Sequence, residues 1–180
     1  VFISSSADGQ LAGGTVTNIE FIDYPGFEDA HSTWGDIGFN PVNKQVYIGV
    51  TNHKDKVGLY AFNTIKKTMH LEGFIGELGN LRDYQWQGKI HTKIVFDKSG
   101  NVIFATDGGE SRQEYLMDHP GGYAGGYFMR WNPGNKTMKN LGMAMPFESI
   151  KDVSVDQETG NIYAVTYPQA HFLVYNASEN

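Results

Sequence analysis

The stretch "GKIHTKIVFDKSGNVIFATDGGE", residues 88–110, places a histidine before one apolar run and two acidic residues after the next. The histidine is His91, and the acidic residues are Asp107 and Glu110. A second histidine, His53, follows a similar apolar run in "VTNHKD". An imidazole changes charge near neutral pH, so it can accept or release a proton during a reaction. We therefore expect His53 and His91 to act in proton transfer.

Tyrosine and arginine residues nearby in the sequence indicate which reaction such histidines can serve. β-Elimination from a uronic acid needs a base for the C5 proton, an acid for the leaving oxygen and a positive group beside the carboxylate. Tyr123 or Tyr127 can partner a histidine, and Arg112 or Arg130 can hold a carboxylate through paired hydrogen bonds. Arg130 lies within "GYFMRW", where a structural role is an equal alternative.

Further aromatic and basic side chains occur in the expected connecting segments, and they suit an extended polar ligand such as an acidic polysaccharide. Aromatic rings can stack on sugar faces, and arginine can pair with carboxylates. The expected substrate-binding residues are Trp34, Arg82, Tyr84, Trp86, Tyr115, Tyr167 and His171.

A divalent metal is a further possibility for the same residues, although no cofactor is firmly indicated. His53 and His91, with Asp107 or Glu110, offer the nitrogen and oxygen ligands that zinc accepts. Calcium on Asp107, Glu110 and loop carbonyls is an alternative. The histidines lack the close spacing of common zinc motifs, and Asp-Gly-Gly is also a frequent turn.

Composition narrows the class of protein. The 180 residues carry a net charge of -6 with scattered basic residues, which argues against nucleic acid as the main partner. No apolar run approaches the roughly 20 residues of a membrane span. There is no cysteine, and the chain begins at Val1 without an initiator methionine. These features fit a processed or excised chain, and we expect it to be secreted or periplasmic.

The elements that must position these side chains are short strands arranged in a repeat. "DIGFNPVNKQVYIGVT", "KIVFDKSGNVIFAT" and "DVSVDQETGNIYAVT" share one order of apolar strand, Asn or Asp turn, and apolar strand ending in Thr51, Thr106 or Thr166. "GLYAFNTIKKTMHLEGF", "GYFMRWNPGNKTMKNLGM" and "HFLVYN" follow them. Four short antiparallel strands per unit predict an all-β protein built from β-propeller blades. A β-sandwich is the alternative, but it does not require its units to resemble one another.

The repeat divides the chain into one propeller region with unequal parts. Residues 1–30 form the expected tail of a preceding blade, followed by a blade at 31–80, a blade at 81–146 with an insertion at 107–125, and a partial blade at 147–180. Propellers usually close with four or more blades. We therefore expect a fragment of a larger propeller, completed by the remaining blades of a parent chain or by a partner subunit.

Strand direction predicts that the unusual side chains share one rim of the propeller. In a blade of four up-and-down strands, the connection between the second and third strands lies at the same end as the crossover into the next blade. The short polar turns "FNPVNK", "DKSG", "DQETG", "NTIKK" and "NPGNK" all fall on the opposite end. His53, His91 and the 107–125 insertion then lie together, where loops on a rigid scaffold usually carry function.

The pattern "GKIHTKIVFDKSGNVIFATDGG", followed by "GGYFMRWNP" and preceded by "VTNHKD", resembles propeller-type polysaccharide lyases such as ulvan and oligogalacturonate lyases. The resemblance covers roughly residues 34–176, and most of it is general blade pattern. It implies a propeller face carrying His, Tyr and Arg, here His53, His91, the tyrosines and Arg112 or Arg130, and in some members a divalent metal.

Two other functions compete with a lyase. One is a non-catalytic propeller that serves as a binding or assembly module of a larger extracellular complex. The other is a propeller around a redox cofactor, which the absence of a Cys-x-x-Cys-His haem motif disfavours.

Overall fold

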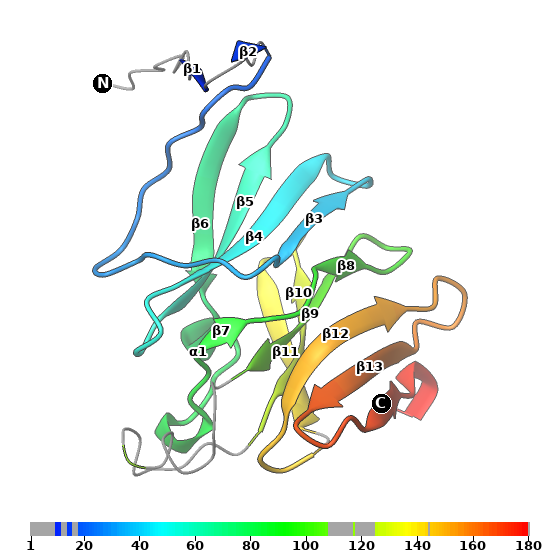
Figure 1. Ribbon diagram of the computed structural model, residues 1–180. Helices are drawn as coiled ribbons and strands as arrows, with labels where there is room; N and C mark the ends of the chain where they lie inside the picture. The colour runs from blue at the N-terminus through cyan, green and yellow to red at the C-terminus, as the bar shows by residue number, and fades with distance from the viewer. Residues whose placement is uncertain are drawn as a thin grey trace.

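The computed structural model describes residues 10–11, 14–15, 18–107, 117, 125–143 and 145–179 (Figure 1). It confirms the expectation of an all-β protein, with three antiparallel sheets and one short two-stranded pair, β1 (Gln10–Leu11) and β2 (Gly14–Thr15). The described residues do not close into a ring or barrel. No helix among them is long and apolar enough to cross a membrane.

The first sheet has four strands in the order in which they occur along the chain. They are β3 (Ile37–Asn40), β4 (Gln45–Thr51), β5 (Val57–Asn63) and β6 (Thr68–Phe74). A short helix, α1 (Ile75–Leu78), and a 3-10 turn, η1 (Asp83–Gln85), lead from it to the second sheet.

The second and third sheets repeat this sequential order. The second contains β7 (Lys89–Ile90), β8 (Val95–Phe96), β9 (Val102–Asp107), β10 (Tyr127–Asn132) and β11 (Thr137–Met143). Both β7 and β8 pair with β9, so together they form one interrupted first strand. The third contains β12 (Ser149–Val155), β13 (Ile162–Tyr167) and β14 (Phe172–Tyr175), and is followed by a 3-10 turn, η2 (Ala177–Glu179).

Asparagine and aspartate side chains close the short turns at one end of the sheets. The Oδ1 atom of Asp97 accepts hydrogen bonds from the backbone N–H groups of Ser99 and Asn101. Asn40 and Asp156 do the same after the other first strands, and Asn63 and Asn132 after the third strands. Each of these side chains bonds the backbone of its own turn. The turns can therefore be recognised from the sequence alone.

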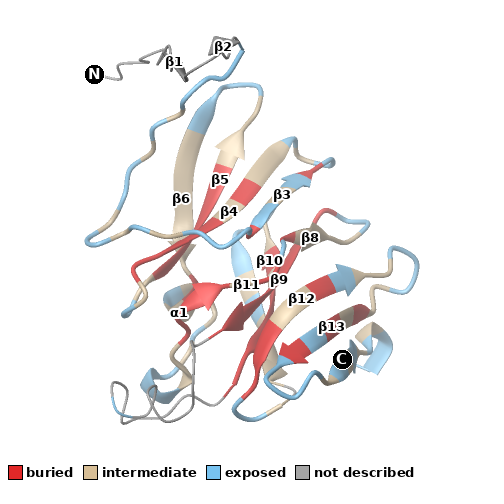
Figure 2. Ribbon diagram, in the orientation of Figure 1, coloured by how far each residue is buried: buried red, intermediate tan, exposed pale blue. Residues whose placement is uncertain are grey.

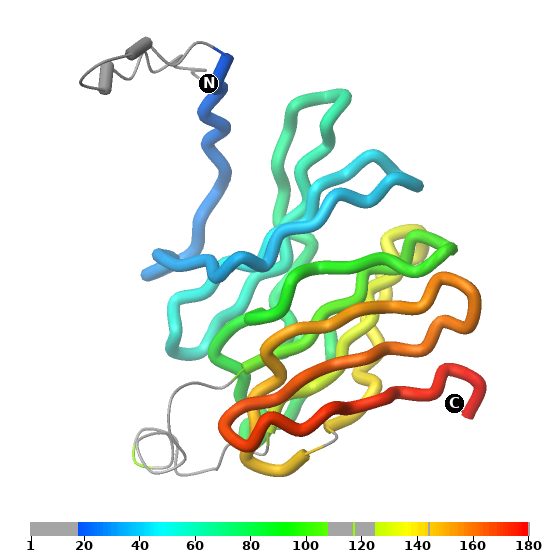
Figure 3. The backbone as a smooth tube through the Cα atoms, turned by 45° about the vertical axis from the view of Figure 1, so that its right-hand side comes forward, coloured from blue at the N-terminus to red at the C-terminus, as the bar shows by residue number. Residues whose placement is uncertain are grey.

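The second sheet lies between the other two, and a separate apolar core fills each interface (Figures 2 and 3). Tyr47 and Leu59 of the first sheet pack with Phe104 and Met129 of the second. On its opposite side, the second sheet contributes a further set of side chains, led by Phe128, to a core shared with the third sheet. The three sheets are therefore stacked in chain order.

The hairpin register corrects one detail of the repeat. Phe39 pairs with Val46, Phe96 with Val102 and Val155 with Ile162, so these pairs are equivalent. Four residues after Val46, Val102 and Ile162 come Val50, Thr106 and Thr166. Val50, and not Thr51, is therefore the equivalent of the other two threonines. The true equivalents at the strand ends are Thr51, Asp107 and Tyr167. Thr51 lies one residue further along its strand from Val46 than Thr106 lies from Val102 or Thr166 from Ile162, so the threonine marker is displaced by one residue in β4.

Candidate active site

Two lysines and a histidine surround Asp107, the last residue of β9. Its side chain is fully buried, and three donors contact it: His91 Nδ1 at 2.6 Å, Lys151 Nζ at 2.6 Å and Ser149 Oγ at 2.5 Å. Burial by itself would raise the pKa of this carboxyl group, but the hydrogen bonds from His91, Lys151 and Ser149 hold the pKa well below its ordinary value. Asp107 is therefore a carboxylate at neutral pH.

Two features of the sheets bring these donors to Asp107. β7 pairs with β9 through Lys89 opposite Asp107, and His91 directly follows β7. β12 packs against β9 from the third sheet and supplies Ser149 and Lys151. Asp107 was expected to open the 107–125 insertion, but it belongs to the strand and lies beneath the rim.

The carboxylate of Asp107 fixes the protonation of His91. Because a carboxylate only accepts hydrogen bonds, Nδ1 of His91 carries the proton. The Nε2 atom then holds the lone pair of the neutral ring, and the side chain is 25% exposed. The Lys151 ammonium lies 3.4 Å from Nδ1. The ring is thus oriented with Nε2 able to accept a proton, as a general base requires.

Aromatic rings and a second lysine border this group. Lys89 Nζ lies 4.0 Å from the ring centre of Trp34 and 4.0 Å from Asp107 Oδ2. The Trp34 ring lies 5.9 Å from that of His91, and Lys151 Nζ lies 5.2 Å from the Tyr167 ring. Trp34 and Tyr167 are 48% and 53% exposed, so both rings are available to a ligand.

His53 joins the same group through Trp34. The indole Nε1–H of Trp34 donates to His53 Nε2 at 2.8 Å, and the His53 ring stacks on His31 at 5.5 Å. A nitrogen that accepts a hydrogen bond carries no proton, so His53 is neutral with its proton on Nδ1. The base role therefore falls to His91. We call Trp34, His53, Lys89, His91, Asp107, Lys151 and Tyr167 the rim cluster.

A second histidine–carboxylate pair lies beside the rim cluster. Nδ1 of His171 contacts Glu148 Oε2 at 2.9 Å, and the Thr166 hydroxyl donates to the same oxygen. Glu148 is buried and directly precedes Ser149 in the chain. Burial would raise its pKa, but the hydrogen bonds from Thr166 and His171 lower it. His171 is thus held in place in the way that His91 is.

Two residues expected to be catalytic lie apart from the rim cluster. Tyr127 is 5% exposed in the core between the first two sheets, and its hydroxyl accepts a hydrogen bond from Gln85 at 3.0 Å. Arg130 shares a face of β10 with Phe128, toward the third sheet, and its buried Nε has no hydrogen-bond partner among the described atoms. Strand alternation turns both side chains into the interfaces between sheets.

The segment between α1 and β7 carries three of the expected binding residues. Arg82 and Tyr84 are exposed, at the start of η1 and within it. The indole N–H of Trp86 donates to the backbone oxygen of Lys54, next to His53. This segment therefore adjoins the loop between β4 and β5, which carries His53 of the rim cluster. Four other expected site residues, Glu110, Arg112, Tyr115 and Tyr123, lie outside the described residues.

Metal binding remains a prediction. In the described part of the chain, no three His, Asp or Glu side chains are grouped so that they can hold a metal ion. His91 and Asp107 contact each other and Lys151, and Glu110 falls outside that part. Calcium or zinc at this position would therefore need the 107–125 segment or a rearranged Asp107.

Sequence reasoning missed Lys89, Ser149, Lys151 and Glu148. A signal was available for Lys151, since Ile90 pairs with Thr106 and Ile150 pairs with Thr166. His91 and Lys151 directly follow these two isoleucines, so they occupy matching places in their repeats. Comparison of the sequence with models of known protein families and with curated proteins gives no significant match.

Proposed function

We propose that this protein is an exported carbohydrate-active β-propeller that cleaves a uronic-acid-containing polysaccharide by β-elimination. The observation that carries the proposal is the rim cluster, in which His91 is oriented by Asp107 and accompanied by Lys151. Trp34 and Tyr167 add exposed rings on the same rim, and such rings suit a sugar chain.

In the proposed reaction, His91 Nε2 removes the proton from C5 of a uronate residue. The electron pair of the C5–H bond forms the C4–C5 double bond, while the C4–O bond breaks and the leaving oxygen takes a proton. Tyr167 and His171 are the candidate donors of that proton. Lys151 and Lys89 supply the positive charge that stabilises the enolate-like carboxylate of the intermediate. The lysines thus take the role that Arg112 and Arg130 have in the sequence interpretation.

The propeller is supported by the repetition of both register and packing direction. Thr51 donates to the backbone oxygen of Gly88, the residue before β7 of the second sheet, and Asp107 contacts Ser149 and Lys151 in the third. Equivalent strand ends therefore face the following sheet at the same rim. Successive sheets related in this way lead to a propeller when further sheets are added.

A non-catalytic binding or assembly module of a larger extracellular complex is the second candidate. It is favoured by apolar side chains exposed on the outer faces of the first and third sheets, including Phe39 at 51% and Phe172 at 68%. Solvated sheet faces normally carry polar residues, so these faces fit contact with another sheet.

The test is the rise in ultraviolet absorbance from the new double bond during incubation with polygalacturonate, alginate and hyaluronate. We expect His91→Ala to lower the rate by about 10²–10⁴-fold, the usual contribution of a general base. His70→Ala is the matched control, because His70 lies in β6 and pairs with Glu72, outside the rim cluster. No absorbance change with any of the three polymers would favour the binding module.

A further inference from the structure

Each sheet has two faces that the hairpin register distinguishes. We call the side toward the next sheet in the chain the following face, and the other side the preceding face. Tyr47 and Ala61 lie on the following face of the first sheet, and Ile103 and Phe128 on that of the second. By register, Tyr47, Ile103 and Tyr163 are equivalent positions.

The third sheet has a following face that no described residue covers. It carries Tyr163 and Val165 of β13 and Phe172 and Val174 of β14, which are cross-strand neighbours. Val165, Phe172 and Val174 are 43%, 68% and 49% exposed. The rings of Tyr163 and Phe172 stack at 6.1 Å beside a shallow hollow of about 160 Å³. The equivalent positions in the other sheets lie in an interface, and all of them except Arg130 are buried.

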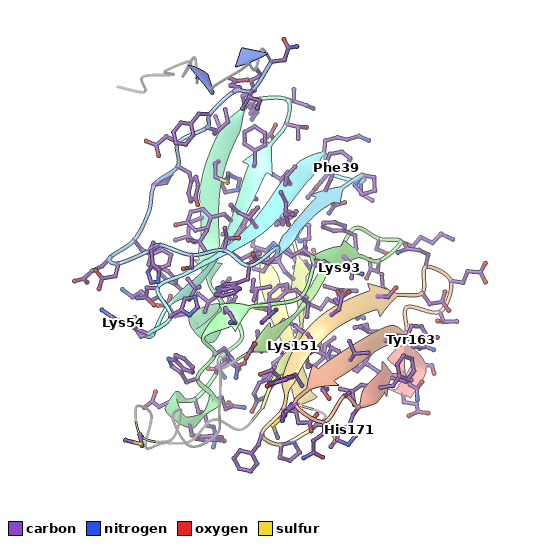
Figure 4. All side chains as sticks on the ribbon, viewed as in Figure 1. Phe39, Lys54, Lys93, Lys151, Tyr163 and His171 are labelled. Atoms are coloured by element: carbon purple, nitrogen blue, oxygen red, sulfur yellow. The ribbon has the colours of Figure 1, made fainter. Side chains whose placement is uncertain are left out.

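The first sheet has a preceding face that is only half covered. Residues 24–27 lie over β5 and β6, where Tyr24 contacts Tyr60 and Phe27 contacts Phe74. The described residues leave the half formed by β3 and β4 open, with Ile37 at 60% and Phe39 at 51% exposure. Figure 4 labels Phe39 on this sheet and Tyr163 on the third sheet, at opposite ends of the stack.

The interfaces inside the chain indicate which surfaces fit each other. The Tyr47 ring of the first sheet lies 6.0 Å from the Phe96 ring of the second. At the next interface, Ile103 and Val155 occupy the equivalent positions in one apolar cluster. Phe39 is the equivalent of Phe96 and Val155, and Tyr163 is the equivalent of Tyr47 and Ile103. The open face of the third sheet therefore fits a surface that the first sheet of this chain presents.

We propose that copies of this chain associate head to tail, with the following face of the third sheet of one copy packed on the open β3–β4 half of the first sheet of another. Tyr163 of one copy then meets Phe39 of the next, as Tyr47 meets Phe96 within the chain. Such a contact joins two different surfaces, so it continues into a closed ring or an open filament. The proposal rests on the packing of the sheets and requires no catalytic activity.

The test is the mass of the full 180-residue chain in solution, measured by sedimentation and by light scattering over a range of concentrations. We expect the wild type to form oligomers at rising concentration. Phe39→Lys places a charge on the open β3–β4 half of the first sheet, and Phe172→Lys places one on the following face of the third sheet. Each variant alone lacks one of the two contact surfaces and should be a monomer. Ile65→Lys is the control, because Ile65 is 80% exposed in the turn between β5 and β6 and lies on neither face.

Mixing the two variants separates this contact from other kinds of association. Each variant keeps the surface that the other has lost, so an equimolar mixture should form a one-to-one dimer that grows no further. A contact between two copies of the same surface would not be restored by mixing. A monomeric wild type at all concentrations, or a mixture that stays monomeric, would overturn the proposal.

Discussion

The two ends of the sheets use carboxylates in different ways. At the turn end, Asp97 and Asp156 accept hydrogen bonds from backbone N–H groups two to four residues away, and each turn is closed from within. At the rim, Asp107 gathers donors from residues 16 to 44 positions away in the chain. Turn carboxylates are therefore part of local folding, whereas the rim carboxylate joins two sheets.

The turn end also contains a buried acid, and the contrast with Asp107 is instructive. Glu72 and Lys136 line a cavity of about 680 Å³ between the first two sheets. Glu72 Oε1 contacts His70 at 3.0 Å, while Oε2 lies 3.6 Å from Lys136 Nζ and accepts no hydrogen bond from the described atoms. Asp107 has three short contacts with a histidine, a lysine and a serine. Among the described residues, the rim therefore combines a fully bonded carboxylate with an oriented base, and the turn end does not.

The largest effect on stability should come from Asp107→Asn. The substitution removes the negative charge that faces the Lys151 ammonium and the N–H of His91. Breaking such a buried pair leaves uncompensated charge and should lower the free energy of unfolding by about 3 kcal/mol. Urea denaturation measures this value.

Asp97→Asn is the matched control at the turn end. Asn40 closes the equivalent turn of the first sheet with an amide oxygen, and Asn63 and Asn132 close the turns after the third strands in the same way, so this change should stay within about 0.5 kcal/mol of wild type. Equal losses for the two variants would contradict the distinction between the rim and the turn end.

The pH dependence of stability should sharpen the same comparison. The folded-state pKa values of Asp107 and Glu148 are lowered from ordinary values of 3.8 and 4.5. Lowered carboxyl pKa values stabilise the fold above the unfolded-state pKa, and this contribution is lost as pH falls through the folded-state values. The urea midpoint should therefore decrease below about pH 4.5.

The variant Asp107→Asn should show a shallower decrease over the same pH range. Asp36 is buried with a raised pKa and acts in the opposite direction, so the difference between wild type and variant is the informative quantity. Parallel curves for the two proteins would exclude Asp107 as a source of the acid sensitivity.

Local features of the fold were predictable from the sequence, and long-range ones were not. The strands and turns follow from apolar alternation and from Asn or Asp side chains that bond their own turns. The same alternation shows that His53 and His91 emerge at one end, and Trp34 links them there. The contacts of Lys151 and Ser149 with Asp107 depend on how the third sheet packs on the second, which no single repeat records.

The sequence also did not reveal on which face of its strand each side chain lies. Tyr127 and Arg130 have side chains suited to catalysis, but their positions in β10 turn them into two different sheet interfaces. A shift of one residue reverses the face of a strand side chain. The offset of Thr51 from Thr106 and Thr166 is also a shift of one residue, along β4, and it places Thr51 on the face opposite to that of Thr106 and Thr166.

The smallest effect should come from Trp34→Phe, which tests whether the indole connects the two rim histidines. Phenylalanine keeps a ring beneath Lys89 but removes the N–H that donates to His53 Nε2. Because this hydrogen bond lies near solvent, its loss should cost only about 0.5 kcal/mol. The imidazole nitrogen shifts of His53 should move from a proton held on Nδ1 toward a mixture of both neutral forms. Those of His70, which pairs with Glu72 at 3.0 Å, should stay the same. If the His53 shifts do not change, the indole does not set its protonation, and the rim histidines are independent of each other.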